Sequence, residues 1–207
     1  MKEIRKNVFH IAYKNQYLLT STMVRLQEFY ECPNYKFRGK YFTHEQFMDW
    51  NSSKNEKGEF DYFDQVEGCN IPDYAVKNFV KVFKGKLWTK EKKMLDKLSK
   101  IKGKYYLIGT YKGNGEKANI NHELAHAYYY LYPEYKKQMK KLVSDESDHL
   151  LSCLYSWLHE AGYCFTEMAD EAQAYLATSN KSFWDTVEGD PSGKVKEYFK
   201  KFNKGQK

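Results

Sequence analysis

Two histidines four residues apart, with a glutamate beside the first, are the residues of this sequence best suited to chemistry. His122, Glu123 and His126 form the pattern His-Glu-x-x-His. On a helix, side chains four residues apart lie on one face, so the two imidazoles can bind one zinc ion. The glutamate can then accept a proton from a water molecule that the zinc activates. The pattern predicts one zinc ion per chain and hydrolytic chemistry, with Glu123 as general base.

The surrounding sequence predicts that a strand precedes a buried helix carrying these residues. The neighbours of the histidines are uncharged, and the predicted helix spans residues 118–132, ending before Pro133. Upstream, residues 104–111 are rich in aromatic and β-branched side chains and are bounded by glycines, which is typical of a strand. A catalytic zinc needs a third protein ligand and an open fourth position. Another element must therefore bring a ligand to this helix.

A second predicted helix, residues 166–178, supplies the candidates for that ligand. Glu167 and Glu171 lie one turn apart on the same face of it. If Glu167 binds the metal, Glu171 can accept a hydrogen bond from a ligating imidazole. If Glu171 binds it, Glu167 and Asp170 remain as supporting groups or alternative ligands. From the residues alone, both glutamates stay open.

The order strand, glycine loop and His-Glu-x-x-His helix resembles the zincin metallopeptidases, over about residues 104–178. The run Asp-Glu-Ala-Gln-Ala-Tyr at 170–175 is similar to the helices that supply the third ligand in gluzincins. This resemblance implies that Glu171 binds zinc with His122 and His126. It also implies that the strand forms the edge of a cleft and pairs with an extended peptide by strand addition. The residues assigned to that substrate-binding strand are Tyr105, Tyr106, Leu107, Ile108, Gly109 and Thr110.

Hydrolysis of a peptide bond also needs a donor for the oxygen that becomes negatively charged. Tyr163 is the preferred candidate, because it lies in the predicted loop that leads to Glu171. The predicted function is a zinc metallopeptidase with a peptide or protein substrate. The alternative is a zincin-like protein, such as a phage or mobile-element regulator, that acts by binding a protein or nucleic acid. Glu123 favours the enzyme, because zinc binding alone does not require it.

The net charge of +7 comes almost wholly from lysine, since only Arg5, Arg25 and Arg38 are arginines. Lysine suits a solvated surface or a diffuse phosphate contact, whereas bidentate recognition of guanine uses arginine. The composition therefore favours a solvated surface, with a nucleic-acid partner as the less favoured alternative. The lysines are densest over residues 90–104, 136–141 and 194–207.

The predicted fold class is α+β and mostly helical, a zincin-like domain with a small sheet beside the metal-binding helix. The chain is long enough to form one domain over residues 1–207. Within it we expect a helical part at 1–103, a metal-site core at 104–178, and a terminal helix with a basic tail at 179–207. Residues 51–70 are predicted as an irregular loop. The other predicted helices span residues 15–31, 43–50, 72–83, 89–101, 134–142, 148–161 and 195–202.

The sequence contains neither a signal-peptide pattern nor an apolar stretch long enough to cross a membrane. Its four cysteines show no Cys-x-x-Cys pairing. We therefore expect a cytoplasmic protein with reduced thiols and no membrane partner.

Overall fold

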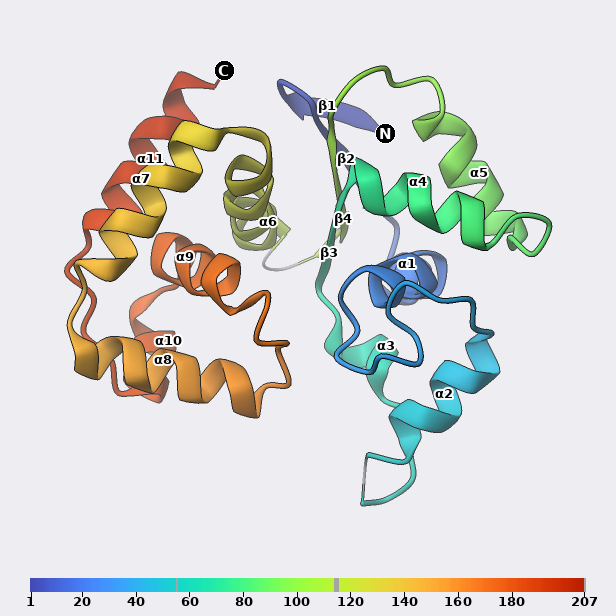
Figure 1. Ribbon diagram of the computed structural model, residues 1–207, viewed down its shortest axis with the longest axis horizontal. Coiled ribbons are helices and arrows are strands. Elements are labelled where there is room, and N and C mark those ends of the chain that lie inside the picture. Colours follow the sequence, from blue (N-terminus) through green and yellow to red (C-terminus); the bar gives the residue numbers. More distant parts are fainter. Residues whose placement is uncertain (55, 114–115, 207) are drawn as a thin grey trace. The chain divides into compact units, whose positions relative to one another are not determined.

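The structure is a computed structural model that describes residues 1–54, 56–113 and 116–206. The chain forms two compact units, Met1–Asn119 and Ile120–Lys207, whose elements are labelled in Figure 1. It is 59% helical with one four-stranded sheet, which confirms the predicted α+β, mostly helical class. The single domain expected from the sequence stays a prediction.

The sheet belongs to the first unit and has the strand order β1-β2-β4-β3. Antiparallel pairing joins β1 (Lys2–Arg5) to β2 (Val8–Tyr13) and β3 (Gly68–Pro72) to β4 (Tyr106–Tyr111). β4 also lies parallel to β2. β4 therefore occupies the interior of the sheet, with a neighbour on each side, while β1 and β3 are its outer strands.

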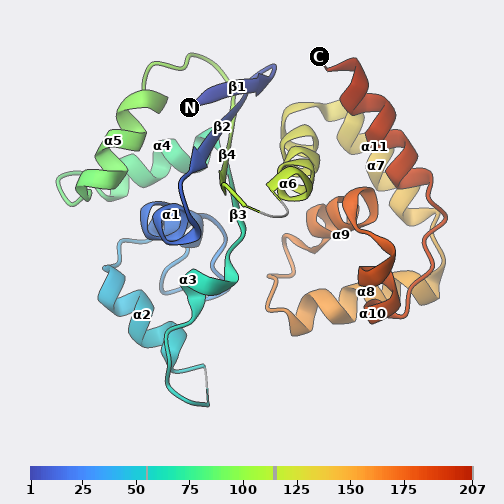
Figure 2. The ribbon, with the colours of Figure 1, turned by 180° about the vertical axis from the view of Figure 1, so that it is seen from behind.

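Helix α1 (Gln16–Glu31) packs against β2, β3 and β4, as Figure 2 shows from behind. A glycine in β4 permits this close approach. A Cβ atom at Gly109 would lie 2.3 Å from Met23 Sδ and 2.9 Å from Leu19 Cδ1. The glycine in the best predicted strand is thus explained by helix packing.

Four further helices complete the first unit. They are α2 (His44–Ser52), α3 (Tyr62–Gln65), α4 (Asp73–Val82) and α5 (Thr89–Leu98). At the start of α2, Thr43 and Gln46 form a capping box, because they exchange side-chain and backbone hydrogen bonds. Helices α1 and α5 are joined by a buried ion pair, in which Arg25 donates to both carboxylate oxygens of Glu91.

The second unit contains helices without strands among its described residues. Helix α6 (Glu116–Leu131) begins in the first unit and continues into the second. It is followed by α7 (Pro133–Ser144), α8 (Asp148–Glu160), α9 (Met168–Thr178), α10 (Lys181–Val187) and α11 (Lys194–Gly205).

Helix α9 is the central element of the second unit. It packs against α7, α8 and α11, and its small residues Ala172 and Ala174 are fully buried. Tyr128 fixes α6 to α11, since its ring contacts Phe202 and its hydroxyl donates to Asn203 Oδ1 at 2.7 Å. These contacts hold α6 and α9 in fixed positions within one unit.

Three parts of the chain differ from the expectations drawn from sequence. The predicted helical part at 1–103 contains β1, β2 and β3, and the predicted loop at 51–70 contains α3 and the start of β3. Helix α10 was not predicted. The strands are short. Strands β2 and β3 pair with β4, which is far away in the chain, and β1 pairs with the neighbouring β2, so pairing within the sheet supports their conformation.

No helix in the described ranges has both the length and the apolar composition required to cross a membrane. All four cysteines are free, with Cys32 and Cys69 buried.

Candidate metal centre

Three side chains of the second unit converge on one point. His122 Nε2 and His126 Nε2, both on α6, lie 3.3 Å apart. Glu171 Oε2, on α9, lies 3.8 Å from the first nitrogen and 3.6 Å from the second. A triangle with these sides has a point about 2.1 Å from every corner, and Zn–N and Zn–O bonds measure about 2.0–2.2 Å. The three atoms therefore have the spacing of ligands that share one zinc ion. Within the described part of the chain they form the sole group of this kind.

The carboxylate of Glu171 supports this interpretation. Its Oε2 atom is shielded from solvent and is beyond hydrogen-bond distance of both imidazoles. Burial by itself would raise the pKa of Glu171, but the positive charge of His126, and then the interactions with His122, lower it below its ordinary value. A buried, ionised oxygen without a donor is unfavourable unless a cation completes its environment. The residues present therefore fit a zinc ion.

Burial and three carboxylates act in opposite directions on the pKa of His126. Its side chain is 2% exposed, and burial alone would lower its pKa. The Glu171, Asp170 and Glu123 carboxylates outweigh that effect and raise the pKa of His126 well above its usual range. The three carboxylates thus favour the protonated form of His126, and a metal ion competes with a proton for this imidazole.

Hydrogen bonds on the far side of each ring orient both imidazoles. His126 Nδ1 lies 3.0 Å from Asp170 Oδ1, and a carboxylate can only accept, so Nδ1 is the donor. His122 Nδ1 lies 3.1 Å from Thr178 Oγ1, whose own hydrogen is donated to the Ala174 carbonyl at 2.7 Å. His122 Nδ1 is therefore a donor too. Both rings thus present Nε2 to the shared point.

Asp170 is itself held by a buried amide. Gln173 Nε2 donates to Asp170 Oδ1 at 3.0 Å, and Tyr135 OH lies 3.4 Å from Gln173 Oε1 as a donor. Gln173 and Tyr135 are completely buried. A chain of hydrogen bonds thus runs from α7 through α9 to His126 on α6.

Three supporting residues, Gln173, Thr178 and Tyr135, were not predicted from sequence. Helix periodicity contained a signal for two of them. Gln173 is three residues after Asp170, and Thr178 is two turns after Glu171. Gln173 therefore shares a helix face with Asp170, to which it donates, and Thr178 shares one with Glu171, the other residue of α9 that approaches His122. Tyr135 comes from another helix and has no such signal.

Glu123 lies among the same charges. It is 6% exposed, and its carboxylate helps to raise the pKa of both His126 and Tyr175. Glu123 is thus near the ligand residues, as a proton acceptor at this centre must be.

Tyr163 reaches the centre through a second tyrosine. The hydroxyls of Tyr163 and Tyr175 lie 3.0 Å apart, and the Tyr175 ring meets the His122 ring edge-on at 4.8 Å. Burial raises the pKa of Tyr175 to about 12; the bond with Tyr163 lowers it, and Glu171 and Glu123 raise it. Tyr175 is therefore a neutral hydroxyl at physiological pH. Trp157 and Phe183 pack on its ring, at 5.1 and 4.9 Å.

The other candidates lie elsewhere. Glu167 precedes α9, accepts a hydrogen bond from Thr166 Oγ1 at 3.1 Å, and is not a member of the converging group.

The prediction that β4 binds the substrate by strand addition needs a correction. Residues 106–110 of β4 pair with β2 on one side and β3 on the other, so their backbone groups cannot accept a peptide by strand addition. Strand addition to this sheet requires β1 or β3.

Comparison of the chain with protein-family models, with curated proteins and with solved structures gave no match. Support for a function therefore comes from the chemistry of the centre itself.

Proposed function

We propose that this protein is a zinc-dependent metallopeptidase with a zincin-like fold, in which His122, His126 and Glu171 hold the metal. The convergence of these three ligand atoms on one point carries the proposal. A bound zinc ion would supply Lewis acidity toward water and toward the carbonyl of a peptide bond. Glu123, one residue after the first ligand, fits the role of general base.

Each remaining residue has a task in this proposal. Asp170 and Thr178 keep the two imidazoles in the tautomer that offers Nε2 to the metal. Glu123 takes the proton from the attacking water and delivers it to the leaving amine. The tyrosine pair Tyr163–Tyr175 supplies a neutral hydroxyl that can donate to the developing negative oxygen.

Zinc binding and peptidase activity are tested with purified full-length protein. Elemental analysis should find close to one zinc per chain, and digestion of a peptide library followed by mass spectrometry should reveal cleavage. Glu123→Gln should keep the zinc and the fold, because the residue is not a ligand. The same variant should lose roughly 10²–10⁴-fold in cleavage rate, the usual contribution of general acid–base catalysis.

The matched control is Glu160→Gln, which removes an exposed carboxylate at the end of α8 and should leave cleavage unchanged. Full activity in Glu123→Gln would remove that residue from the mechanism. Stoichiometric zinc without cleavage of any peptide would favour the alternative, a zincin-like protein that acts by binding.

A further inference from the structure

Lysines gather on two helices of the second unit. Helices α7 and α11 are far apart in sequence, yet they pack against each other. Together they carry two acidic residues, Glu134 and Glu197. We call their nine lysines the α7–α11 lysine face: Lys136, Lys137, Lys140, Lys141, Lys194, Lys196, Lys200, Lys201 and Lys204.

This concentration of charge is not an average property of the unit. From residue 120 onward the chain has eleven lysines, no arginine and thirteen acidic residues, a net charge of −2. The nine lysines and two glutamates of α7 and α11 give +7. The rest of the unit, with two lysines and eleven acidic residues, is therefore −9. The positive charge of this unit is thus concentrated on two helices that pack against each other.

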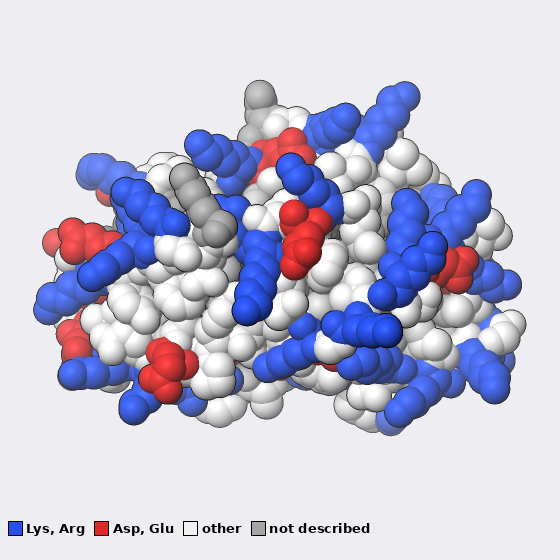
Figure 3. Space-filling view, turned by 90° about the horizontal axis from the view of Figure 1, so that it is seen from above, with Lys and Arg blue, Asp and Glu red and all other residues white. Residues whose placement is uncertain are grey.

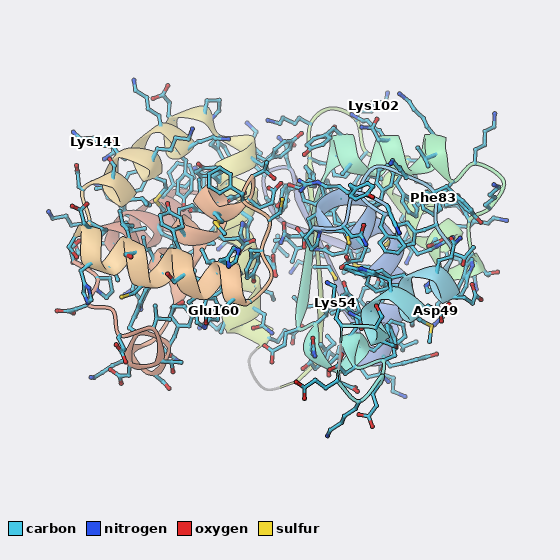
Figure 4. The ribbon with its side chains drawn as sticks, turned by 60° about the horizontal axis from the view of Figure 1, so that its bottom comes forward. Asp49, Lys54, Phe83, Lys102, Lys141 and Glu160 are labelled. Carbon is cyan, nitrogen blue, oxygen red and sulfur yellow. The ribbon has the colours of Figure 1, made fainter. Side chains whose placement is uncertain are left out.

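The lysines of this face are available to a partner. All are exposed except Lys196, which is half-buried and donates to the Ser179 carbonyl at 2.7 Å. In the part of the chain that the structure describes, none of them forms an ion pair. Figure 4 shows Lys141 extending outward from α7. On the face of the chain drawn in Figure 3, basic side chains outnumber acidic ones.

The spacing and the type of these residues favour a phosphate backbone. Lysines four positions apart on a helix, such as Lys137 and Lys141, recur about every 6 Å along its axis. Ammonium groups act as point charges toward phosphate, and the unit has no arginine for reading base edges. A partner that presents a regular row of phosphates therefore fits better than one recognised by its sequence.

A membrane surface fits less well. An amphipathic helix binds a bilayer by burying its apolar side in the lipid. The apolar side of α11 is already occupied, because Phe199 is buried and Phe202 packs on Tyr128 and Tyr135. We infer that the α7–α11 lysine face binds the phosphate backbone of nucleic acid without sequence preference. The metal centre is not needed for this binding.

The test uses full-length protein and fluorescence anisotropy with two labelled DNA duplexes of unrelated sequence, each about 20 base pairs long. Both duplexes should bind equally well, with an affinity that falls steeply as sodium chloride rises. Replacement of Lys137, Lys141, Lys200 and Lys204 by glutamine should weaken binding at least about tenfold. The slope of log K against log salt should become shallower by about 0.9 for each phosphate that the variant no longer neutralises.

A matched variant removes the same charge from residues 90–104, the lysine-rich segment in and just after α5. Glutamine at Lys92, Lys93, Lys97 and Lys100, all exposed, should change the affinity less than about threefold. Equal losses in the two variants would show a diffuse effect of net charge and overturn the proposal. Binding to phosphatidylserine vesicles without binding to either duplex would also overturn it. Circular dichroism and zinc content should be the same in both variants, which separates this result from the fate of the metal centre.

Discussion

Each unit buries a cluster of charged side chains, and the two clusters are built differently. In the first unit, Arg25 donates to both oxygens of Glu91 and to the carbonyls of Phe42 and Lys86, while Glu91 also accepts from the Trp88 backbone. In the second unit, Glu171 Oε2 faces two imidazole nitrogens at distances too long for hydrogen bonds. The first cluster is complete within the protein. The second leaves Glu171 Oε2 without a hydrogen-bond donor, which fits the proposed zinc ion.

This difference separates a structural ion pair from a binding centre. A buried pair is tolerated when its polar atoms have partners, and each guanidinium nitrogen of Arg25 and each carboxylate oxygen of Glu91 has one. Ligand atoms must instead keep their lone pairs directed at one shared point, which requires supporting residues to hold them there. Asp170 and Thr178 hold the two histidines in this way. The Arg25–Glu91 pair does not need such supporting residues.

The largest effect is expected from breaking the Arg25–Glu91 ion pair. Arg25→Met should lower the free energy of unfolding by about 3–5 kcal/mol, because it leaves Glu91 buried without its cation. Urea denaturation followed by circular dichroism measures this change. The double variant Arg25→Met with Glu91→Leu should recover much of the loss, since no lone charge remains. A single variant as stable as the parent would show that the pair is not the structural element inferred from its geometry.

The second largest effect is expected from removal of Glu171, the proposed third ligand. Glu171→Ala should weaken zinc binding by more than roughly 100-fold, because removal of a direct ligand exceeds the 10–100-fold loss typical of an outer partner. Glu167→Ala is the matched control and should have little effect. Competition with a chromophoric chelator measures both affinities. The reverse order would transfer the ligand role to Glu167.

Smaller losses are expected from the residues that orient the imidazoles. Asp170→Asn and Thr178→Val should each weaken zinc binding by roughly 10–100-fold while the ligands stay in place. Thr178→Ser keeps the hydroxyl that accepts from His122 and should restore the parent affinity. A valine variant with the parent affinity would show that this hydrogen bond does not contribute to zinc binding.

The smallest effect is expected from His44, a buried histidine that lies near a cation. Its ring stacks on Trp88 at 3.6 Å, and both of its nitrogens are shielded and lack a hydrogen-bond partner in the described structure. Burial, and then the positive Arg25, lower the pKa of His44 to about 4. Between its ordinary pKa of 6.5 and this value, the unfolded chain binds a proton that the folded chain excludes.

Stability should therefore fall as the pH drops through this window, by on the order of 1 kcal/mol at about pH 5. His44→Phe keeps the stacked ring and should flatten that part of the curve. Thermal unfolding of the two proteins from neutral pH to about pH 5 measures the difference. Identical curves would show that His44 does not contribute to acid sensitivity.

His126, with its raised pKa, has the opposite effect on stability. Its contribution to the stability of the metal-free protein is full below pH 6.5 and disappears as the pH rises through the raised pKa.

The fold could be predicted from sequence where local patterns were strong. The helices at 15–31 and 148–161 and the strand at 104–111 lie within a few residues of α1, α8 and β4. Strands β2 and β3 were missed because their pairing partner β4 is far away in the chain, and β1 was missed with them because it pairs with β2. For the same reason the interior position of β4 was not predicted, although it decides that β4 cannot bind a peptide by strand addition.

The sequence by itself determined the two imidazoles and their glutamate, because the pitch of a helix fixes residues four apart on one face whatever surrounds them. It also limited the third ligand to two neighbouring glutamates. In the tertiary structure Glu171 is the one of the two that approaches the imidazoles, since α9 is held by α7, α8 and α11 in the orientation that turns it toward α6. It likewise packed the lysine-rich helices α7 and α11 against each other. Both results depend on packing between segments tens of residues apart, and no local pattern in the chain encodes that packing.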